Sequence, residues 1–154
     1  MERALVVVYQ IEGMEWLVAE AGRLAAGVGA DLIALHVRSE SDYEEDRRAV
    51  EDVMAEESSS YDLDQAIEGA EQVAADVVKG ALADVDVEYE AVGAIGERAE
   101  RILGEAESRG CDHIFIPGRR RSPTGKALFG DTAQHVILNF AGPVTIVTHP
   151  LTDL

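Results

Sequence analysis

The run ALVVVY at residues 4–9 decides the class of fold, because six consecutive apolar residues rich in valine suit a strand buried on both faces. Two later runs have the same character, DLIALHV at residues 31–37 and HIFIP at residues 113–117. A shorter apolar run follows at residues 144–148. Strands buried on both faces belong to parallel sheets that helices cover on each side.

Helix-like segments alternate with these strands. Four of them carry apolar side chains at helical spacing: residues 15–28, 66–81, 99–106 and 133–140. Residues 85–91 alternate apolar and acidic side chains, which predicts a half-exposed strand at a sheet edge, and residues 93–96 then predict a turn. The order β-α-β-α-β-α-β-α-β predicts a single α/β domain over residues 1–154, with a five-stranded parallel sheet in a Rossmann-like three-layer sandwich.

One segment does not fit this alternation. Residues 40–57 hold nine acids against Arg47 and Arg48, and three serines follow at residues 58–60. A charge run of this kind is usually solvated. We therefore expect residues 40–60 to form an acidic, mobile connection in which a short helix is possible.

The whole chain is strongly acidic. Its 154 residues include 30 acids and 13 bases, a net charge of −17, and only two of the bases are lysine. This charge argues against binding to nucleic acid or anionic membranes. An acid-rich, lysine-poor surface suits molar salt, so we expect a salt-adapted, haloarchaeal protein, with an ordinary acidic protein as the alternative.

Several other classes are excluded by what the sequence lacks. No apolar run approaches the roughly 20 residues that span a bilayer, and the first residues do not read as a secretory signal, so we expect a cytoplasmic protein. The single cysteine, Cys111, rules out an internal disulfide. The four histidines show no ligand spacing, so we expect no metal site formed by side chains.

A basic island interrupts the acidic sequence. No acid occurs between Asp112 and Asp131, and this window holds four bases and three glycines: Arg119, Arg120, Arg121, Lys126, Gly118, Gly125 and Gly130. Glycines let backbone N–H groups approach an anion, and a following helix N-terminus adds positive potential. The island therefore predicts an anion site after a central strand, although the arginines would also suit pairing with nearby acids. It is not a Walker P-loop, because Ala127 follows Lys126 where that motif has Ser or Thr.

Residues 112–136, DHIFIPGRRRSPTGKALFGDTAQHV, resemble the C-terminal signature of the universal stress protein (UspA-like) family. The segments GPVTIV at residues 142–147 and LHV at residues 35–37 fit as well. The resemblance covers nearly the whole chain except residues 40–57. It implies a flavodoxin-like fold with strand order 3-2-1-4-5, and a homodimer formed through the last strand.

Nucleotide-binding members of that family hold ATP with a glycine, two residues, a second glycine, nine residues and a third glycine followed by Ser or Thr. Gly118 matches the first glycine and Gly130 the third, whereas Arg121 stands at or beside the second. Asp131 stands where the hydroxyl is expected, with Thr132 one position later. A carboxylate there repels phosphate unless a cation bridges the two.

The family's aspartate at the end of strand one aligns with Tyr9, whose ring could stack on a base or fill the crevice. The resemblance gives this candidate site: Val8, Tyr9, Val37, Gly118, Arg119, Arg120, Arg121, Gly125, Lys126, Gly130, Asp131 and Thr132. Two functions stay open, a stress-response regulator that binds ATP with Mg²⁺, and a dimeric interaction module with a degenerate motif and no cofactor. The sequence places no general base, so we expect no catalysis beyond the slow ATP hydrolysis known in the family.

Overall fold

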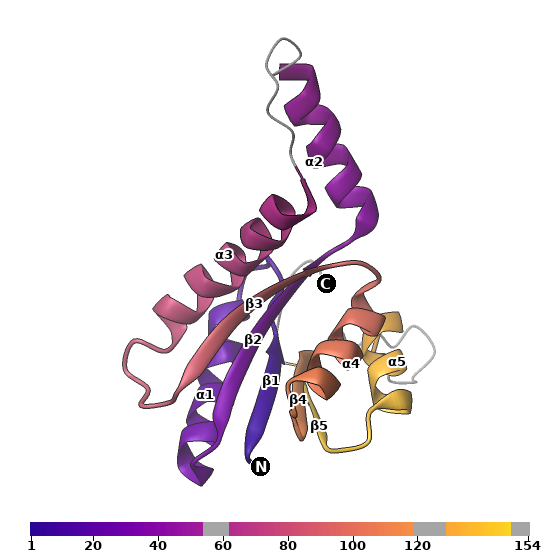
Figure 1. Ribbon diagram of the computed structural model, residues 1–154. Helices are drawn as coiled ribbons and strands as arrows, with labels where there is room; N and C mark the ends of the chain where they lie inside the picture. The colour runs from indigo at the N-terminus through magenta and orange to yellow at the C-terminus, as the bar shows by residue number, and fades with distance from the viewer. Residues whose placement is uncertain (54–61, 119–128, 149–154) are drawn as a thin grey trace.

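The computed structural model describes residues 1–53, 62–118 and 129–148 (Figure 1). The strands are β1 (Arg3–Val7), β2 (Asp31–Arg38), β3 (Tyr89–Ile95), β4 (His113–Pro117) and β5 (Val144–Val147). The helices are α1 (Met14–Val28), α2 (Glu40–Val53), α3 (Leu63–Ala81), α4 (Arg98–Ser108) and α5 (Asp131–Asn139).

The five strands form one parallel sheet in the order β3-β2-β1-β4-β5, as the sequence predicted. The central strand β1 pairs with β2 through Val7 and Leu35, and with β4 through Val6 and Phe115. Helices α1 and α3 cover one face of the sheet, and α4 and α5 cover the other (Figure 1). The strand order reverses between β1 and β4, which is where open α/β sheets leave a crevice beyond their carboxyl ends.

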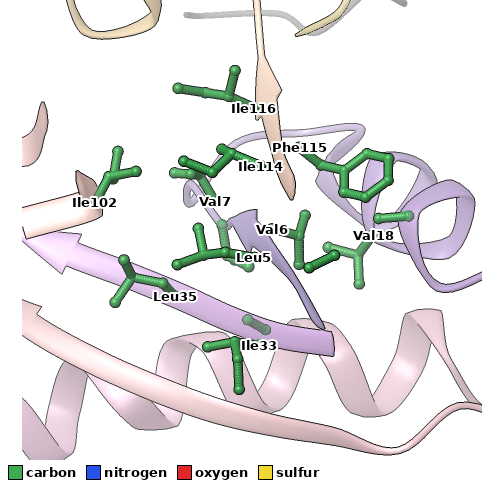
Figure 2. Packing of buried hydrophobic residues seen from close by; sticks show 14 of the residues in the cluster. Leu5, Val6, Val7, Val18, Ile33, Leu35, Ile102, Ile114, Phe115 and Ile116 are labelled. Atoms are coloured by element: carbon green, nitrogen blue, oxygen red, sulfur yellow. The ribbon is translucent and has the colours of Figure 1, made fainter. Parts of the chain in front are cut away.

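Both faces of β1 are buried, which explains why residues 4–9 form an unbroken apolar run. On one face Leu5 lies near Ile102 of α4, and on the other Val6 lies near Val18 of α1 (Figure 2). Each such side chain contributes about 1.5–3 kcal/mol when it is fully buried. The core therefore holds β1 in a fixed position, and with it the crevice residues that follow this strand.

The predicted bounds of β3 were wrong. The strand spans Tyr89–Ile95 instead of residues 85–91, and it does lie at the sheet edge. Val85 and Val87 pack on the core from the connection before the strand, so their alternation with acids reflects one buried side of a loop. Gly93 lies inside the strand rather than in a turn. The residue at this position must be glycine because a Cβ there would collide with the backbone of α3.

The acidic segment also differs from expectation, because Glu40–Val53 forms the 14-residue helix α2. This helix extends away from the sheet (Figure 1). The hydroxyl of Ser39 accepts a hydrogen bond from the amide of Asp42 at 3.1 Å, and an ion pair of 2.7 Å joins Arg38 to Asp46. Acids in the first turn favour the positive end of the helix dipole, so a high acid content does not preclude a helix here.

Candidate functional site

Two cavities lie side by side beyond the carboxyl ends of the central strands. The first, of about 230 Å³, is lined by residues that follow β1, by the last residues of β2, and by one residue each of α2 and α4: Tyr9, Gln10, Ile11, His36, Val37, Arg38, Asp42 and Arg98. The second, of about 240 Å³, lies between the ends of β1 and β4 and the start of α5: Tyr9, Arg98, Pro117, Phe129, Gly130, Asp131, Thr132 and Ala133. Among the described residues, Tyr9 and Arg98 alone line both cavities.

Tyr9 and Arg98 therefore form the wall between the two cavities. The guanidinium carbon of Arg98 lies 4.4 Å from the centroid of the Tyr9 ring, which is a cation–π contact. Tyr9 itself is 8% exposed. The crevice predicted between the ends of β1 and β4 is present, and an aromatic ring covered by a cation stands at its centre.

The phenol of Tyr9 reaches toward the first turn of α5. Burial raises its pKa above the usual value of 10.0, while the charge and hydrogen bond of Arg98 and a hydrogen bond from Thr132 oppose that rise. Tyr9 is thus a neutral hydrogen-bonding residue at physiological pH. Its interaction with Thr132 closes the second cavity on the side of β1.

His36 lies in the wall of the first cavity and is 4% exposed. Its Nδ1 lies 2.7 Å from the carbonyl oxygen of Val8, and because a carbonyl accepts, Nδ1 must donate. Burial lowers the pKa of His36, the Val8 hydrogen bond opposes this, and the charges of Arg38 and Arg98 lower it further. The ring is therefore neutral, and its Nε2 is a buried acceptor without a partner among the described residues.

The start of α5 carries the residues that align with the end of the family's ATP motif. Gly130 precedes the helix with φ +77°, a conformation that favours glycine, and Asp131 is the first helical residue. Gly130 holds the N-cap position, and the described residues supply no side-chain cap hydrogen bond there. The carboxylate of Asp131 lies in the lining of the second cavity, together with Thr132.

The predicted site residues fall into three groups. Tyr9, Val37, Gly130, Asp131 and Thr132 line the cavities, as expected. Val8 and Gly118 do not: Val8 is fully buried and offers only its carbonyl to His36, and the amide of Gly118 bonds to Val147 at 2.9 Å. The remaining predictions lie outside the described residues: Arg119, Arg120, Arg121, Gly125 and Lys126.

Arg98 and Arg38 are cavity residues that sequence reasoning missed. One signal for Arg98 was available, since it is the first residue of α4, where a base opposes the helix dipole and an acid is favoured. A basic residue at the start of a helix therefore indicates a role other than stabilising that helix. Arg38 gave no signal, because the end of a strand is an ordinary place for a charged residue.

Other candidate chemistry is missing from the described parts of the chain. Cys111 is buried, and burial raises the pKa of its thiol to about 11, so it is a packed residue and not a reactive thiolate. Residues 1–53, 62–118 and 129–148 contain no cluster of three groups able to hold a metal ion. No helix within those ranges combines the length and the apolar character needed to cross a membrane.

The parallel sheet in the order 3-2-1-4-5, with a divided crevice beyond β1 and β4, defines a Rossmann-like α/β protein with a candidate ligand site. A model of the universal stress protein family matches residues 1–148, and the chain belongs to that family. No curated protein sequence matches this chain.

Solved structures share the fold along almost the entire chain. A universal stress protein from Archaeoglobus fulgidus is 21% identical, with a TM-score of 0.66 over 96% of this chain and 99% of that one. Another from Archaeoglobus fulgidus, in complex with dAMP, is 15% identical, with a TM-score of 0.59 over 96% and 98%. A universal stress protein in complex with cAMP is 16% identical, with a TM-score of 0.59 over 96% of each chain.

Proposed function

We propose that this universal stress protein binds an adenine nucleotide in the crevice beyond β1 and β4 and acts as a regulator in a stress response. The family resemblance implies ATP with Mg²⁺ as the ligand. The observation that carries the proposal is the pair of cavities meeting at Tyr9 and Arg98, at the point where the strand order reverses.

The two cavities suit the two ends of a nucleotide. In the first, the aromatic ring of Tyr9 and the apolar Val37 and Ile11 offer surfaces for a base. In the second, the amides at the start of α5 attract a phosphate. Asp131 repels a phosphate directly, so a bridging cation such as Mg²⁺ has a clear part to play there.

The comparisons support this ligand class. Both nucleotides named with the related structures, dAMP and cAMP, carry adenine. Those proteins share the fold of this chain, and nearly its full length. An adenine nucleotide is therefore the first ligand to test.

The test is isothermal titration of the protein with Mg-ATP in high salt, together with mass spectrometry of the protein as purified. Saturable heat, or an adenine nucleotide that co-purifies, supports the proposal. The absence of both for ATP, AMP and cAMP would contradict it.

The second candidate is a dimeric interaction module that binds no nucleotide. It is favoured by the burial of Tyr9, which is 8% exposed and hydrogen-bonds toward Thr132, so that its ring fills the centre of the crevice. The dimer would form through β5, at the edge of the sheet. All four β5 residues are only partly buried, and Leu138 of the neighbouring α5 is 81% exposed.

Sedimentation equilibrium tests the dimer separately from the nucleotide. A dimer that Leu138→Asp leaves intact would place the interface elsewhere, and a wild-type monomer at all concentrations would end the dimer proposal. The matched control is Leu63→Asp, which puts the same charge on the exposed start of α3.

A further inference from the structure

Arg98 is an exposed cation in a chain with an excess of acids. No carboxylate of the described residues lies within ion-pair distance of it, whereas Arg38, the other cavity arginine, pairs with Asp46 at 2.7 Å. Arg101 of α4 and Arg109, the C-cap of that helix, both pair with Glu105. Arg98 is exposed, and its one described partner is the ring of Tyr9.

The position of Arg98 points to a role in ligand binding more directly than its lack of an ion-pair partner among the described residues does. Arg98 borders both cavities, so its side chain lies next to a ligand bound in either. Its charge is already felt within the first cavity, where it acts on His36. Asp42 in the first cavity and Asp131 in the second carry the opposing charges.

The guanidinium also occupies the place that a ligand ring would take. A guanidinium is planar and stacks on aromatic faces, as a purine does. Arg98 covers one face of the Tyr9 ring, and both residues line the two cavities. A base can lie on that face only if the Arg98 side chain moves aside, and a side chain that moves aside at this position stays next to the ligand.

We propose that Arg98 recognises the anionic group of the ligand, and that it does so by leaving the face of Tyr9 as the base stacks there. The inference rests on the proposed nucleotide binding and goes further, because it names the residue that reads the charge of the ligand. The ligand class that fits is a planar aromatic ring joined to an anion. The family's glycine motif does not include this position.

The experiment compares AMP with adenosine, which share the base and sugar and differ in the phosphate. Titration calorimetry is performed on the wild type, Arg98→Gln, Arg98→Lys and the control Arg23→Gln. Arg23 pairs with Glu20 on α1, away from both cavities, and its substitution changes the net charge equally. Circular dichroism and thermal melting confirm that each variant is folded.

Arg98→Gln should weaken AMP binding by about tenfold or more, since a charge-assisted contact to phosphate is lost. Adenosine should bind this variant as tightly as the wild type, or more tightly, because the ring of Tyr9 is uncovered. Arg98→Lys should lose less AMP affinity, since the charge remains but the planar fork does not. Arg23→Gln should change neither affinity.

Three results would overturn the inference. If the wild type binds AMP and Arg98→Gln binds it equally well, another group reads the phosphate and nucleotide binding itself stands. If Arg98→Gln loses AMP and adenosine by the same factor, Arg98 supports the base and not the anion. If the wild type binds neither AMP, adenosine nor Mg-ATP, the proposed function fails and this inference fails with it.

Discussion

The guanidinium of Arg98 covers the ring of Tyr9 at 4.4 Å, so the cation of α4 meets the aromatic residue that follows β1 across the centre of the crevice. A cation–π contact at an exposed site is worth about 0.5–1 kcal/mol. A base that stacks on an aromatic side chain gains about 1–3 kcal/mol. It is therefore favourable for a nucleobase to replace the guanidinium of Arg98 on the ring of Tyr9, even before the contact between Arg98 and the phosphate is added.

Replacing Tyr9 with alanine distinguishes a stacking surface from a plug. If Tyr9 carries the base, Tyr9→Ala loses about 1–3 kcal/mol of binding, a fall of roughly five- to 150-fold in AMP affinity. Tyr89→Ala, on the exposed edge strand β3, should have no effect. Calorimetry that shows tighter binding by Tyr9→Ala would identify the ring as a plug and favour the interaction-module function.

Gly93 makes a packing prediction that is independent of function. Gly93→Ala places a methyl group against the α3 backbone at Ile67 and Glu71, and overpacking of this kind costs about 1–3 kcal/mol. Gly104→Ala, in α4, meets no atom within 4 Å and should instead stabilise by about 0.4–1 kcal/mol. Denaturant unfolding midpoints check both signs, and a neutral Gly93→Ala would mean that β3 and α3 are not so close.

His36 makes the stability of the protein depend on pH. Because burial lowers its pKa, the unfolded chain takes up this proton at higher pH than the folded chain does. The contribution of His36 to the free energy of unfolding is fully present above the usual histidine pKa of about 6.5. It falls as the pH drops toward the lowered pKa of the folded state, by up to about 1.4 kcal/mol per pH unit.

Unfolding free energies measured between pH 8 and pH 5, a range chosen around the roughly 6.5 of free histidine, test this dependence. His36→Gln should flatten the curve below pH 6.5, because it removes the titrating group. Equal slopes in the wild type and His36→Gln would show that the pKa of His36 is the same in the folded and unfolded states, which would contradict the lowered pKa.

The basic island is expected to form a third part of the anion site, beside Arg98 and the start of α5. Replacing Arg119, Arg120 and Arg121 with Gln should abolish phosphate binding if the island contacts the ligand, while circular dichroism shows the fold intact. The same calorimetric series with AMP and Mg-ATP measures it. Unchanged affinity would leave Arg98 and the start of α5 as the whole of the anion site.

The charge of −17 predicts that the protein needs salt. Screening reduces repulsion among the 30 acids, so the free energy of unfolding should rise from millimolar to molar KCl. Denaturant titrations at fixed KCl concentrations measure it, with urea as the uncharged denaturant. A protein fully folded without salt, and no more stable in molar KCl, is an ordinary acidic protein and not a salt-adapted one.

The fold was predictable where buried strands left an unambiguous pattern. The apolar run at His113–Pro117 lies between Asp112 and Gly118, and β4 has those bounds. The error at β3 arose because residues 85–88 bury alternate side chains from a loop, which gives the same pattern as a strand. Helix α2 is longer than the short helix that the acidic sequence allowed for, because it is stabilised by a cap and an ion pair that composition does not reveal.

The site was predictable only where the motif or the strand ends point to it. Tyr9 follows β1, Val37 lies near the end of the parallel strand β2, and Gly130 to Thr132 begin a helix, so topology brings them to one crevice. Arg98 comes from a helix on the other side of that crevice. Its proximity to Tyr9 depends on how α4 packs on the sheet, which no local pattern records.

The most direct test of the account is a crystal structure of the protein grown with saturating AMP. We predict density for adenine against the ring of Tyr9, with the guanidinium of Arg98 turned from the ring to the phosphate. A crevice without nucleotide density, in which Arg98 still covers Tyr9, would contradict the account and leave the interaction module as the function.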